Sequence, residues 1–309
     1  MSEDTQTLDE VVVVGFGTQR KANLTEAVAT VDTKILDSRP VTNLGQSLQG
    51  TIPGLNLSVG GLGGQLGQTM DVNIRGTGTI STGSKAATLV LIDGIEGNMN
   101  NLNPDDVESI SVLKDAAASS IYGSRAAFGV ILITTKKGNS AGQHKISFST
   151  SLTFDNAFSL NKMQNRYGVS DVVDSWGERK SMPVEDNLKD FFRTGVTSIT
   201  SLSVSHGSEK QQNYFSYANT TGKGIIEKNR LSKHNLNFRE TSQIFDKRLR
   251  LDGSVNVMRQ VIKNKPVSGG FYMNPLVGLY RFPRGENLSY YKEHFETYNE
   301  DRKLNVQNW

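Results

Sequence analysis

The chain has 309 residues, 34 Lys and Arg against 31 Asp and Glu, a formal net charge of +3, and no cysteine. This length corresponds to about two domains, and the near balance of charge disfavours a dedicated nucleic-acid-binding protein. The absence of cysteine excludes disulfides and thiolate metal sites. No apolar run approaches the roughly 20 residues of a membrane-spanning helix, and residues 1–10 are too polar and acidic for a signal peptide.

The first distinctive stretch is LDEVVVVGFGTQR, Leu8–Arg20. Four valines followed by Gly15 and Gly17 are typical of a dinucleotide-binding strand, but that motif needs a third glycine where Arg20 stands. An arginine there would overfill the gap between helix and strand. The valines also suit a tethered peptide that adds a strand to a partner's sheet. Equally, they suit the first strand of the chain's own domain.

Residues 24–138 combine apolar strands, short helical patterns and many glycines. A helix is predicted over Asn43–Gly50, with Asn43 as its N-cap and Gly50 as its end. A compact β-α-β unit is predicted over residues 107–135, with its helix over KDAAASSIY. Further strands are predicted in the segments AVATVD, GLNLSV, DVNIRG and TLVLIDGI.

Two polar motifs interrupt these strands. Asp93–Gly94 is predicted to form a turn, because Asp bonds its own backbone and Gly supplies positive φ. Asn103–Asp106, NPDD, is interpreted as a solvated acidic turn rather than a cation site, since Ca²⁺ takes six to eight oxygen ligands. The four histidines show no metal-ligand spacing, and no Ser/His/Asp grouping indicates hydrolysis. We therefore expect no catalytic residues, no metal and no cofactor.

From about residue 144 the sequence alternates between apolar and polar residues. In HKISFSTSLTFD the apolar side chains share one face and the serines share the other. The segments SLSVSHG, QQNYFSYANTTG, HNLNFRE and RLRLDGSVNVMRQ follow, although the second of these is ambiguous. Such strands fit either a sandwich packed on one side or a transmembrane β-barrel.

The connections favour the barrel. Roughly 40 residues (156–196) separate the first two strands, and ordinary domains rarely contain loops of that length. A tight connection, a medium one and a second tight one follow, as in barrels with short periplasmic turns and longer outer loops. After the fifth strand a long irregular tail is predicted to Trp309. Five strands cannot close a barrel without leaving unpaired backbone groups in lipid. We therefore expect the chain to be a fragment of a longer protein.

Several stretches taken together resemble one known family. These are LDEVVVVGFGTQRKANLTEAVATVD, LGQSLQGTIPGLNL, VNIRGTGT, LVLIDGI and NPDDVESISVLKDAAASSIYGSRAAFGVILITTKKG. In this order they resemble the TonB box and plug domain of the SusC/RagA-type TonB-dependent transporters of the Bacteroidetes. FRTG at Phe192–Gly195 and the alternating strands after it resemble the start of that family's barrel.

The resemblance implies an α+β plug domain followed by antiparallel transmembrane strands, the first part of a 22-stranded β-barrel. It implies domains at 1–17 (flexible N-terminus with the TonB box), 18–140 (plug) and 141–309 (about five barrel strands). The implied location is the bacterial outer membrane, and the implied function is TonB-dependent uptake of glycans or peptides. A signal-transducing receptor is the alternative, and a soluble dinucleotide-binding enzyme is a remote one.

The resemblance also implies partners and site residues. TonB, powered by ExbB and ExbD, would bind the box, and a SusD-like surface lipoprotein would cover the barrel. The box falls on Asp9, Glu10, Val11, Val12, Val13, Val14 and Gly15. Arg75 and Gly76 occupy a position where the family has an arginine that pairs within the plug or with the barrel, and we interpret this as structural. Many members carry a further domain before the box, which we expect to be absent or trimmed here.

Overall fold

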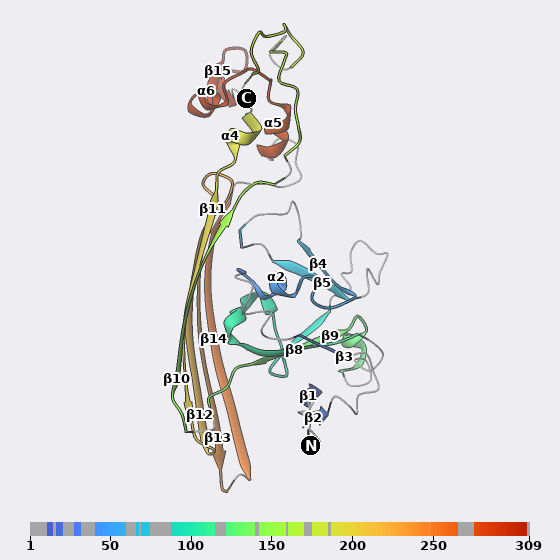
Figure 1. The fold of residues 1–309 in the computed structure, drawn as a ribbon, viewed down its shortest axis with the longest axis vertical. Coiled ribbons are helices and arrows are strands. Elements are labelled where there is room, and N and C mark those ends of the chain that lie inside the picture. The colour runs from blue at the N-terminus through green and yellow to red at the C-terminus, as the bar shows by residue number, and fades with distance from the viewer. Residues whose placement is uncertain are drawn as a thin grey trace, which may run out of the picture. The chain divides into compact units, whose positions relative to one another are not determined.

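A computed structural model gives the fold of the chain (Figure 1). It describes residues 11–14, 17–20, 28–31, 41–59, 66–67, 69–74, 88–114, 122–139, 142–158, 160–169, 175–184, 187–246, 248–264 and 275–307. The chain forms two compact units. The first comprises Met1–Thr153, Ser198–Thr221 and Leu231–Val261, and the second comprises Phe154–Thr197, Gly222–Arg230 and Ile262–Trp309.

The N-terminal part of the first unit, residues 28–139, is called the plug region below. Its main sheet has the strand order β3-β8-β9-β6-β7. These strands are β3 (Val28–Val31), β6 (Leu89–Ile92), β7 (Ile95–Glu96), β8 (Val107–Leu113) and β9 (Val130–Thr135). A separate antiparallel pair is formed by β4 (Leu55–Val59) and β5 (Met70–Ile74). Short 3-10 helices lie at η2 (Met99–Asn101), η3 (Pro104–Asp106) and η4 (Gly123–Ala126).

The plug core uses both faces of the main sheet. Ile131 and Ile133 pack into one apolar cluster, whereas Val130 and Leu132 pack into another on the opposite face. Burial on both faces explains why β9 is a continuous apolar run rather than an alternating one. Each such buried side chain contributes about 1.5–3 kcal/mol to folding.

Helix α2 (Leu44–Leu48) confirms the helix predicted over Asn43–Gly50. The Asn43 side chain accepts a hydrogen bond from the Gln46 backbone N–H at 3.0 Å, as an N-cap does. Gly50 has φ +74°, a conformation that favours glycine where a helix ends. Leu44 and Leu48 are fully buried in the first core cluster, which connects α2 to the sheet.

The predicted β-α-β unit is wrong in its strand pairing. Strands β8 and β9 lie where expected, but they pair with each other in the antiparallel sense. The parallel neighbour of β9 is β6, with Ile92 opposite Ile133. The chain between β8 and β9 therefore reverses direction instead of making a parallel crossover. Most of the helix predicted in that connection lies outside the described residues.

Five long strands follow the plug region and form one sheet in sequence order, called the wall below (Figure 1). They are β10 (Lys145–Asp155), β11 (Gly195–Gly207), β12 (Gln211–Lys223), β13 (Arg230–Ile244) and β14 (Leu249–Lys263). The ambiguous segment QQNYFSYANTTG is thus strand β12.

The wall has an apolar outer face and a polar inner face. On β13, Leu236 and Phe238 are 39% and 40% exposed, whereas the alternating Asn237 and Arg239 are 3% and 4% exposed. On β10, Phe148 is 68% exposed. A sandwich would bury its apolar face, so this inverted pattern contradicts the sandwich alternative and is that of a lipid-facing strand.

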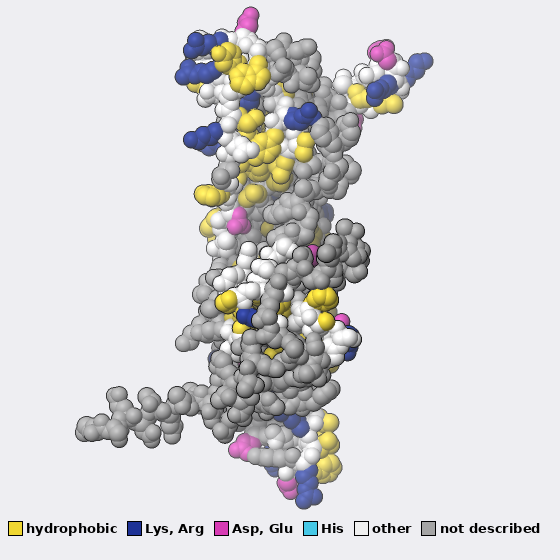
Figure 2. Space-filling view, turned by 90° about the vertical axis from the view of Figure 1, so that its right-hand side faces the viewer, with side chains coloured by type: hydrophobic (Ala, Val, Ile, Leu, Met, Phe, Trp, Pro, Cys, Tyr) yellow, Lys and Arg dark blue, Asp and Glu magenta, His cyan; other side chains and the backbone are white. Residues whose placement is uncertain are grey.

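The second unit contains more structure than the predicted irregular tail. It holds α4 (Asn187–Phe191), α5 (Pro275–Arg281), α6 (Leu288–Glu293) and the hairpin of β15 (Glu296–Asn299) with β16 (Leu304–Gln307). Leu188, Phe191, Ile226 and Leu279 form its small core, which orders these short elements. Other hydrophobic side chains stay on its surface beside Lys and Arg (Figure 2).

Residues before the plug region form a separate hairpin. Strand β1 (Val11–Val14) pairs antiparallel with β2 (Gly17–Arg20), with Val14 opposite Gly17. The two strands make up a sheet of their own. Among the described helices, none has both the length and the apolar character needed to cross a membrane.

Candidate functional site

Strand β13 carries the polar side chains that meet the plug region. Its inward positions are Lys233, Asn235, Asn237, Arg239 and Thr241, each 3–4% exposed. Side chains alternate between the faces of a strand, so this set shares one face. Buried polar groups need hydrogen-bond partners, and three of these five find them in the plug region.

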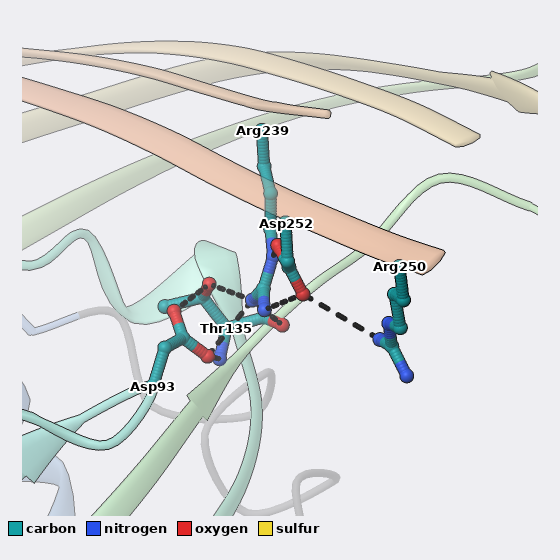
Figure 3. Close-up of polar contacts among 5 residues, drawn as sticks. All are labelled: Asp93, Thr135, Arg239, Arg250 and Asp252. Atoms are coloured by element: carbon teal, nitrogen blue, oxygen red, sulfur yellow. Dashed lines mark hydrogen bonds and ion pairs between the residues drawn. The ribbon is translucent and has the colours of Figure 1, made fainter. Parts of the chain in front are cut away.

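Arg239 is the centre of a group of ion pairs and hydrogen bonds called the lock below, which consists of Asp93, Thr135, Arg239 and Asp252 (Figure 3). Its Nη1 donates to Asp93 Oδ1 at 2.8 Å and to Thr135 Oγ1 at 2.8 Å. Its Nε and Nη2 donate to the two carboxylate oxygens of Asp252, each at 2.9 Å. Arg239 therefore joins β14 of the wall to β6 and β9 of the plug region.

The local fold explains how Asp93 reaches this position. Asp93 and Gly94 have φ 49° and 87° and connect β6 to β7, which confirms the predicted turn. Because β6 and β9 are parallel neighbours, the residue after Ile92 lies beside the end of β9. The Asp93 carboxylate accepts there from the Thr135 backbone N–H at 3.0 Å and from Thr135 Oγ1 at 2.6 Å.

The charges of the lock are nearly balanced. One guanidinium meets two carboxylates, and Arg250 lies 3.5 Å from Asp252 with its own side chain 54% exposed. Paired arginine forks of this kind give directional, charge-assisted bonds. Removal of one partner from a buried pair costs about 3–5 kcal/mol, because the other charge is left uncompensated.

A second contact lies further along the same strand. Lys233 Nζ donates to the Asn100 carbonyl at 3.1 Å, and Asn235 Nδ2 donates to the Asn101 carbonyl at 2.7 Å. Both carbonyls belong to η2, so β13 binds the backbone of this short helix. These contacts depend on the position of η2 and only weakly on its side chains.

The acidic turn NPDD makes the third contact, which contradicts its interpretation as a solvated turn. Asp106 is 1% exposed, and its Oδ1 accepts from the Tyr214 hydroxyl of β12 at 2.9 Å. Asp105 Oδ2 accepts from Ser149 of β10 at 3.1 Å and from Ser201 of β11. Sequence patterns missed this contact because its donors lie 44 or more residues away.

Burial raises the pKa of the Asp106 carboxyl. Removal from water raises the pKa of the Asp106 carboxyl above its usual value of 3.8, although hydrogen bonds from Ser216 and Tyr214 and the charge of Lys136 oppose the rise. The neighbouring Asp105 charge raises it further. The protonated form is therefore more favoured in the folded protein than in the unfolded chain.

Gly138 lies where the chain leaves the plug region. A Cβ at this position would lie 2.3 Å from the Asn213 backbone nitrogen and 2.6 Å from the His206 carbonyl oxygen. Real side chains do not approach backbone atoms so closely, so only glycine fits without movement. The segment after β9 thus passes directly against the ends of β11 and β12.

The remaining predicted site residues are only partly described. Val11–Val14 form strand β1, while Asp9, Glu10, Gly15, Arg75 and Gly76 lie outside the described residues. Gly17 begins a second strand rather than a helix, which contradicts the dinucleotide-binding alternative, because that motif needs a helix there. Among the described residues no group of three His, Cys, Asp or Glu side chains is placed to hold a metal ion.

A plug region fixed to the polar inner face of a lipid-facing wall defines a class of outer-membrane receptor. Residues 20–130 match the TonB-dependent Receptor Plug Domain family. The chain is 34% identical over 244 residues to TonB-dependent receptor P39 of Formosa agariphila, covering 74% of this chain and 23% of that protein. It is 30% identical over 281 residues to TonB-dependent receptor SusC of Bacteroides thetaiotaomicron, covering 84% and 27%.

A solved structure has the same arrangement. The RagAB peptide importer in its open-open state matches with a TM-score of 0.78 and 27% sequence identity over 90% of this chain and 35% of that chain. The chain belongs to the TonB-dependent receptors of the bacterial outer membrane and is similar to the SusC and RagA type. It spans about a quarter of the length of the curated relatives it matches.

Proposed function

We propose that the protein containing this chain imports a polar oligomer, a glycan or a peptide, across the outer membrane by a TonB-dependent mechanism. One observation carries the proposal: the plug region is bound by the lock to the inner face of a wall whose outer face is apolar. Such a plug has to move before any solute passes. The similarity to SusC and to the RagAB peptide importer supports the same class of function.

The N-terminal hairpin suits capture by TonB. Strand β1 pairs only with β2 among the described residues, so the other edge of β1 offers backbone groups for a further strand. An isolated two-stranded hairpin is marginally stable in water, so β2 can also be displaced at little cost. TonB would bind Asp9–Gly15 by adding a strand, with main-chain hydrogen bonds supplying the affinity.

Strand pairing also suits the transmission of force. Tension along paired strands loads several hydrogen bonds at once, and the outer membrane has no nucleotide supply of its own. TonB, energised by ExbB and ExbD, would pull the hairpin away from the plug region. The plug would then be displaced or partly unfolded, and a path would open along the wall.

A surface partner fits the second unit. Several large side chains there are exposed, including Phe158 at 95%, Trp176 at 65% and Phe295 at 59%. We assign this surface to a SusD-like lipoprotein, in keeping with the two-component name of the RagAB importer.

Binding of a synthetic peptide of residues 5–20 to a TonB C-terminal domain tests the capture step. We expect saturable binding that persists in Val13→Ile, which keeps a β-branched side chain, and that is lost in Val13→Pro. Proline removes the backbone N–H and cannot pair within a strand. Absence of binding, or equal binding by the proline variant, would argue strongly against capture through this strand.

The same two substitutions in the full-length receptor extend the test to cells. Cross-linking of the receptor to TonB is expected for the unchanged protein and for Val13→Ile, and not for Val13→Pro. The receptor's abundance in the outer membrane serves as the control for folding, because the hairpin lies outside the plug sheet.

A further inference from the structure

An open groove of about 920 Å³ lies within the first unit, between the plug region and strands β10, β11 and β12. Its plug side includes Asp105 and Glu108 from the turn and start of β8, and Lys136 and Lys137 from the segment after β9. Its wall side is a hydroxyl surface of six serines: Ser147, Ser149, Ser151, Ser201, Ser203 and Ser205.

The alternation of the two strands produces this hydroxyl surface. Three serines alternate in the middle of β10 and three near the end of β11, while Phe148 and Leu202 point to the outer face, where they are 68% and 39% exposed. A serine side chain is much smaller than the Lys, Asn and Arg side chains that β13 presents to the plug region. The wall therefore fills the space beside β13 and leaves it open beside β10 and β11.

The contacts across the groove are also of a weaker kind than those of the lock. Asp105 accepts from the hydroxyls of Ser149 and Ser201, and the adjacent Asp106 accepts from the hydroxyl of Tyr214, which also lines the groove. No ion pair crosses the groove among the residues the structure describes. Hydrogen bonds from neutral hydroxyls are readily exchanged for hydrogen bonds to water. The ion pairs of the buried Arg239 guanidinium cannot be replaced by hydrogen bonds to water unless the side chain becomes exposed.

We propose that this hydroxyl-lined groove is the passage by which the imported oligomer crosses the plug region, and that the plug stays fixed at the lock while the acidic turn moves away from β10 and β11. The inference rests on the proposed import function. It assigns the route to one side of the plug, so the plug does not need to leave the wall as a whole.

The groove chemistry indicates what it would pass. Each serine hydroxyl both donates and accepts hydrogen bonds, so it can pair with sugar hydroxyls or peptide amides in turn as they move past. Asp105 and Glu108 line this space together with Lys136, Lys137 and Lys145, so both signs of charge are present, with one more lysine than carboxylates. The fitting solute is a chain rich in hydroxyl or amide groups that is neutral or weakly acidic.

The test uses thiol labelling in the full-length receptor, made cysteine-free beyond this chain, in cells with an active TonB system. Ser203→Cys places a thiol in the groove, and Asn237→Cys places one on the inner face of β13, 3% exposed and outside the groove lining. A sulfonated, membrane-impermeant maleimide is the probe. Cells without TonB and a receptor lacking residues 9–15 are the references, and the heat-modifiable mobility of the barrel reports folding.

We expect TonB to accelerate labelling of Ser203→Cys and to leave Asn237→Cys unreactive. A rise of the open form from about 1% to about 10% of molecules makes labelling roughly tenfold faster. Equal acceleration at both positions would mean that the whole plug leaves the wall, and it would overturn the proposal. Acceleration at Asn237→Cys alone would place the route at the lock and would overturn it as well.

Failure of the proposed function gives a different result. If neither thiol responds to TonB and the receptor lacking residues 9–15 behaves like the intact one, the import function itself is contradicted. A neutral oligosaccharide mixture and a peptide digest, added separately, identify the solute, since the transported class should slow labelling of Ser203→Cys. Protection by neither mixture, with TonB-dependent labelling intact, would contradict passage through the groove.

Discussion

The two halves of the plug region differ in how they are attached to the wall. The C-terminal half, residues 88–139, provides the lock, the η2 contact, the acidic turn and the close approach at Gly138. In the N-terminal half, a hydrogen bond from Gln260 Nε2 of the wall reaches the Gly67 carbonyl at 3.4 Å. Charge-assisted bonds connect the C-terminal half to the wall, and the N-terminal half shares an apolar core with the C-terminal half.

This difference bears directly on the response to force. A pull on β1 reaches β3 first, and β3 is an edge strand that pairs only with β8. The strands nearest the lock, β6 and β9, lie further along the sheet and later in the chain. We therefore expect the N-terminal half to detach before the C-terminal half, which would leave the lock intact at that stage.

The largest effect is expected at the lock. Arg239→Ala leaves Asp93 and Asp252 without their guanidinium, and the loss of stability should be about 3–5 kcal/mol. The midpoint and slope of plug unfolding in guanidinium chloride, measured on the detergent-solubilised receptor, give this loss of unfolding free energy. The matched control is Arg250→Ala, whose side chain is 54% exposed, and an exposed pair contributes about 0–1 kcal/mol. Equal losses in the two variants would contradict the assignment of the lock.

A moderate effect is expected where the chain passes from plug to wall. Gly138→Ala forces a Cβ to within 2.3 Å of the Asn213 backbone, and overpacking of this kind costs about 1–3 kcal/mol. Gly253→Ala is the control, because a Cβ there would meet no atom within 4 Å. Thermal unfolding of both variants checks the prediction, and a Gly138→Ala variant as stable as the control would show that this segment readily shifts.

Arg239 and Asp93 show how much of the lock can be predicted from the sequence. The alternation in HNLNFRE placed Arg239 on the polar face of its strand, and the Asp-Gly pair located the turn at Asp93. Neither pattern indicates that the two residues meet, because 146 residues separate them and the contact depends on how the plug sheet packs against the wall. The periodicity of local structure is encoded in short segments, whereas the partner of a buried charge is decided by tertiary packing.

The acidic turn makes the stability of the folded protein depend on pH. The pKa of Asp106 is raised in the folded protein, so this group contributes stability that is fully present below the unfolded value of about 3.8. That contribution is lost as the pH rises through the folded pKa. Asp106→Asn does not titrate, so its stability relative to the unchanged protein should increase as the pH rises. A difference that is constant with pH, or that falls, would contradict the burial of this carboxyl.

The turn also shows where prediction from sequence failed. NPDD has the composition of a solvated turn, and nothing near it in the chain supplies the hydroxyls that bind it. Ser149, Ser201 and Tyr214 come from three different wall strands. The order inside the second unit was missed for a similar reason, because Leu188, Ile226 and Leu279 come from distant segments.

The smallest effect is expected at the groove itself. Ser201→Ala removes one hydroxyl donor to the Asp105 carboxylate. A hydrogen bond to a charged group contributes about 1.5–3 kcal/mol, and Ser149 still donates to the same oxygen, so the loss should lie near the lower end of this range. Ser205→Ala is the control, since Ser205 lines the same groove and is hydrogen-bonded to none of the described residues of the plug region. The free energy of plug unfolding should be slightly lower for Ser201→Ala than for Ser205→Ala. A loss of stability in Ser201→Ala as large as that in Arg239→Ala would contradict the distinction between groove and lock.

Pulling single molecules of the full-length receptor through the N-terminal hairpin tests the difference between the two halves most directly. Release of residues 15–88 with the lock intact should give a first extension of roughly 250 Å, at about 3.4 Å per residue. A second, stronger event should follow, and it should weaken in Arg239→Ala. A single step of roughly 420 Å, corresponding to all of residues 15–138 at the same length per residue, would show that both halves leave the wall together and would contradict the claim.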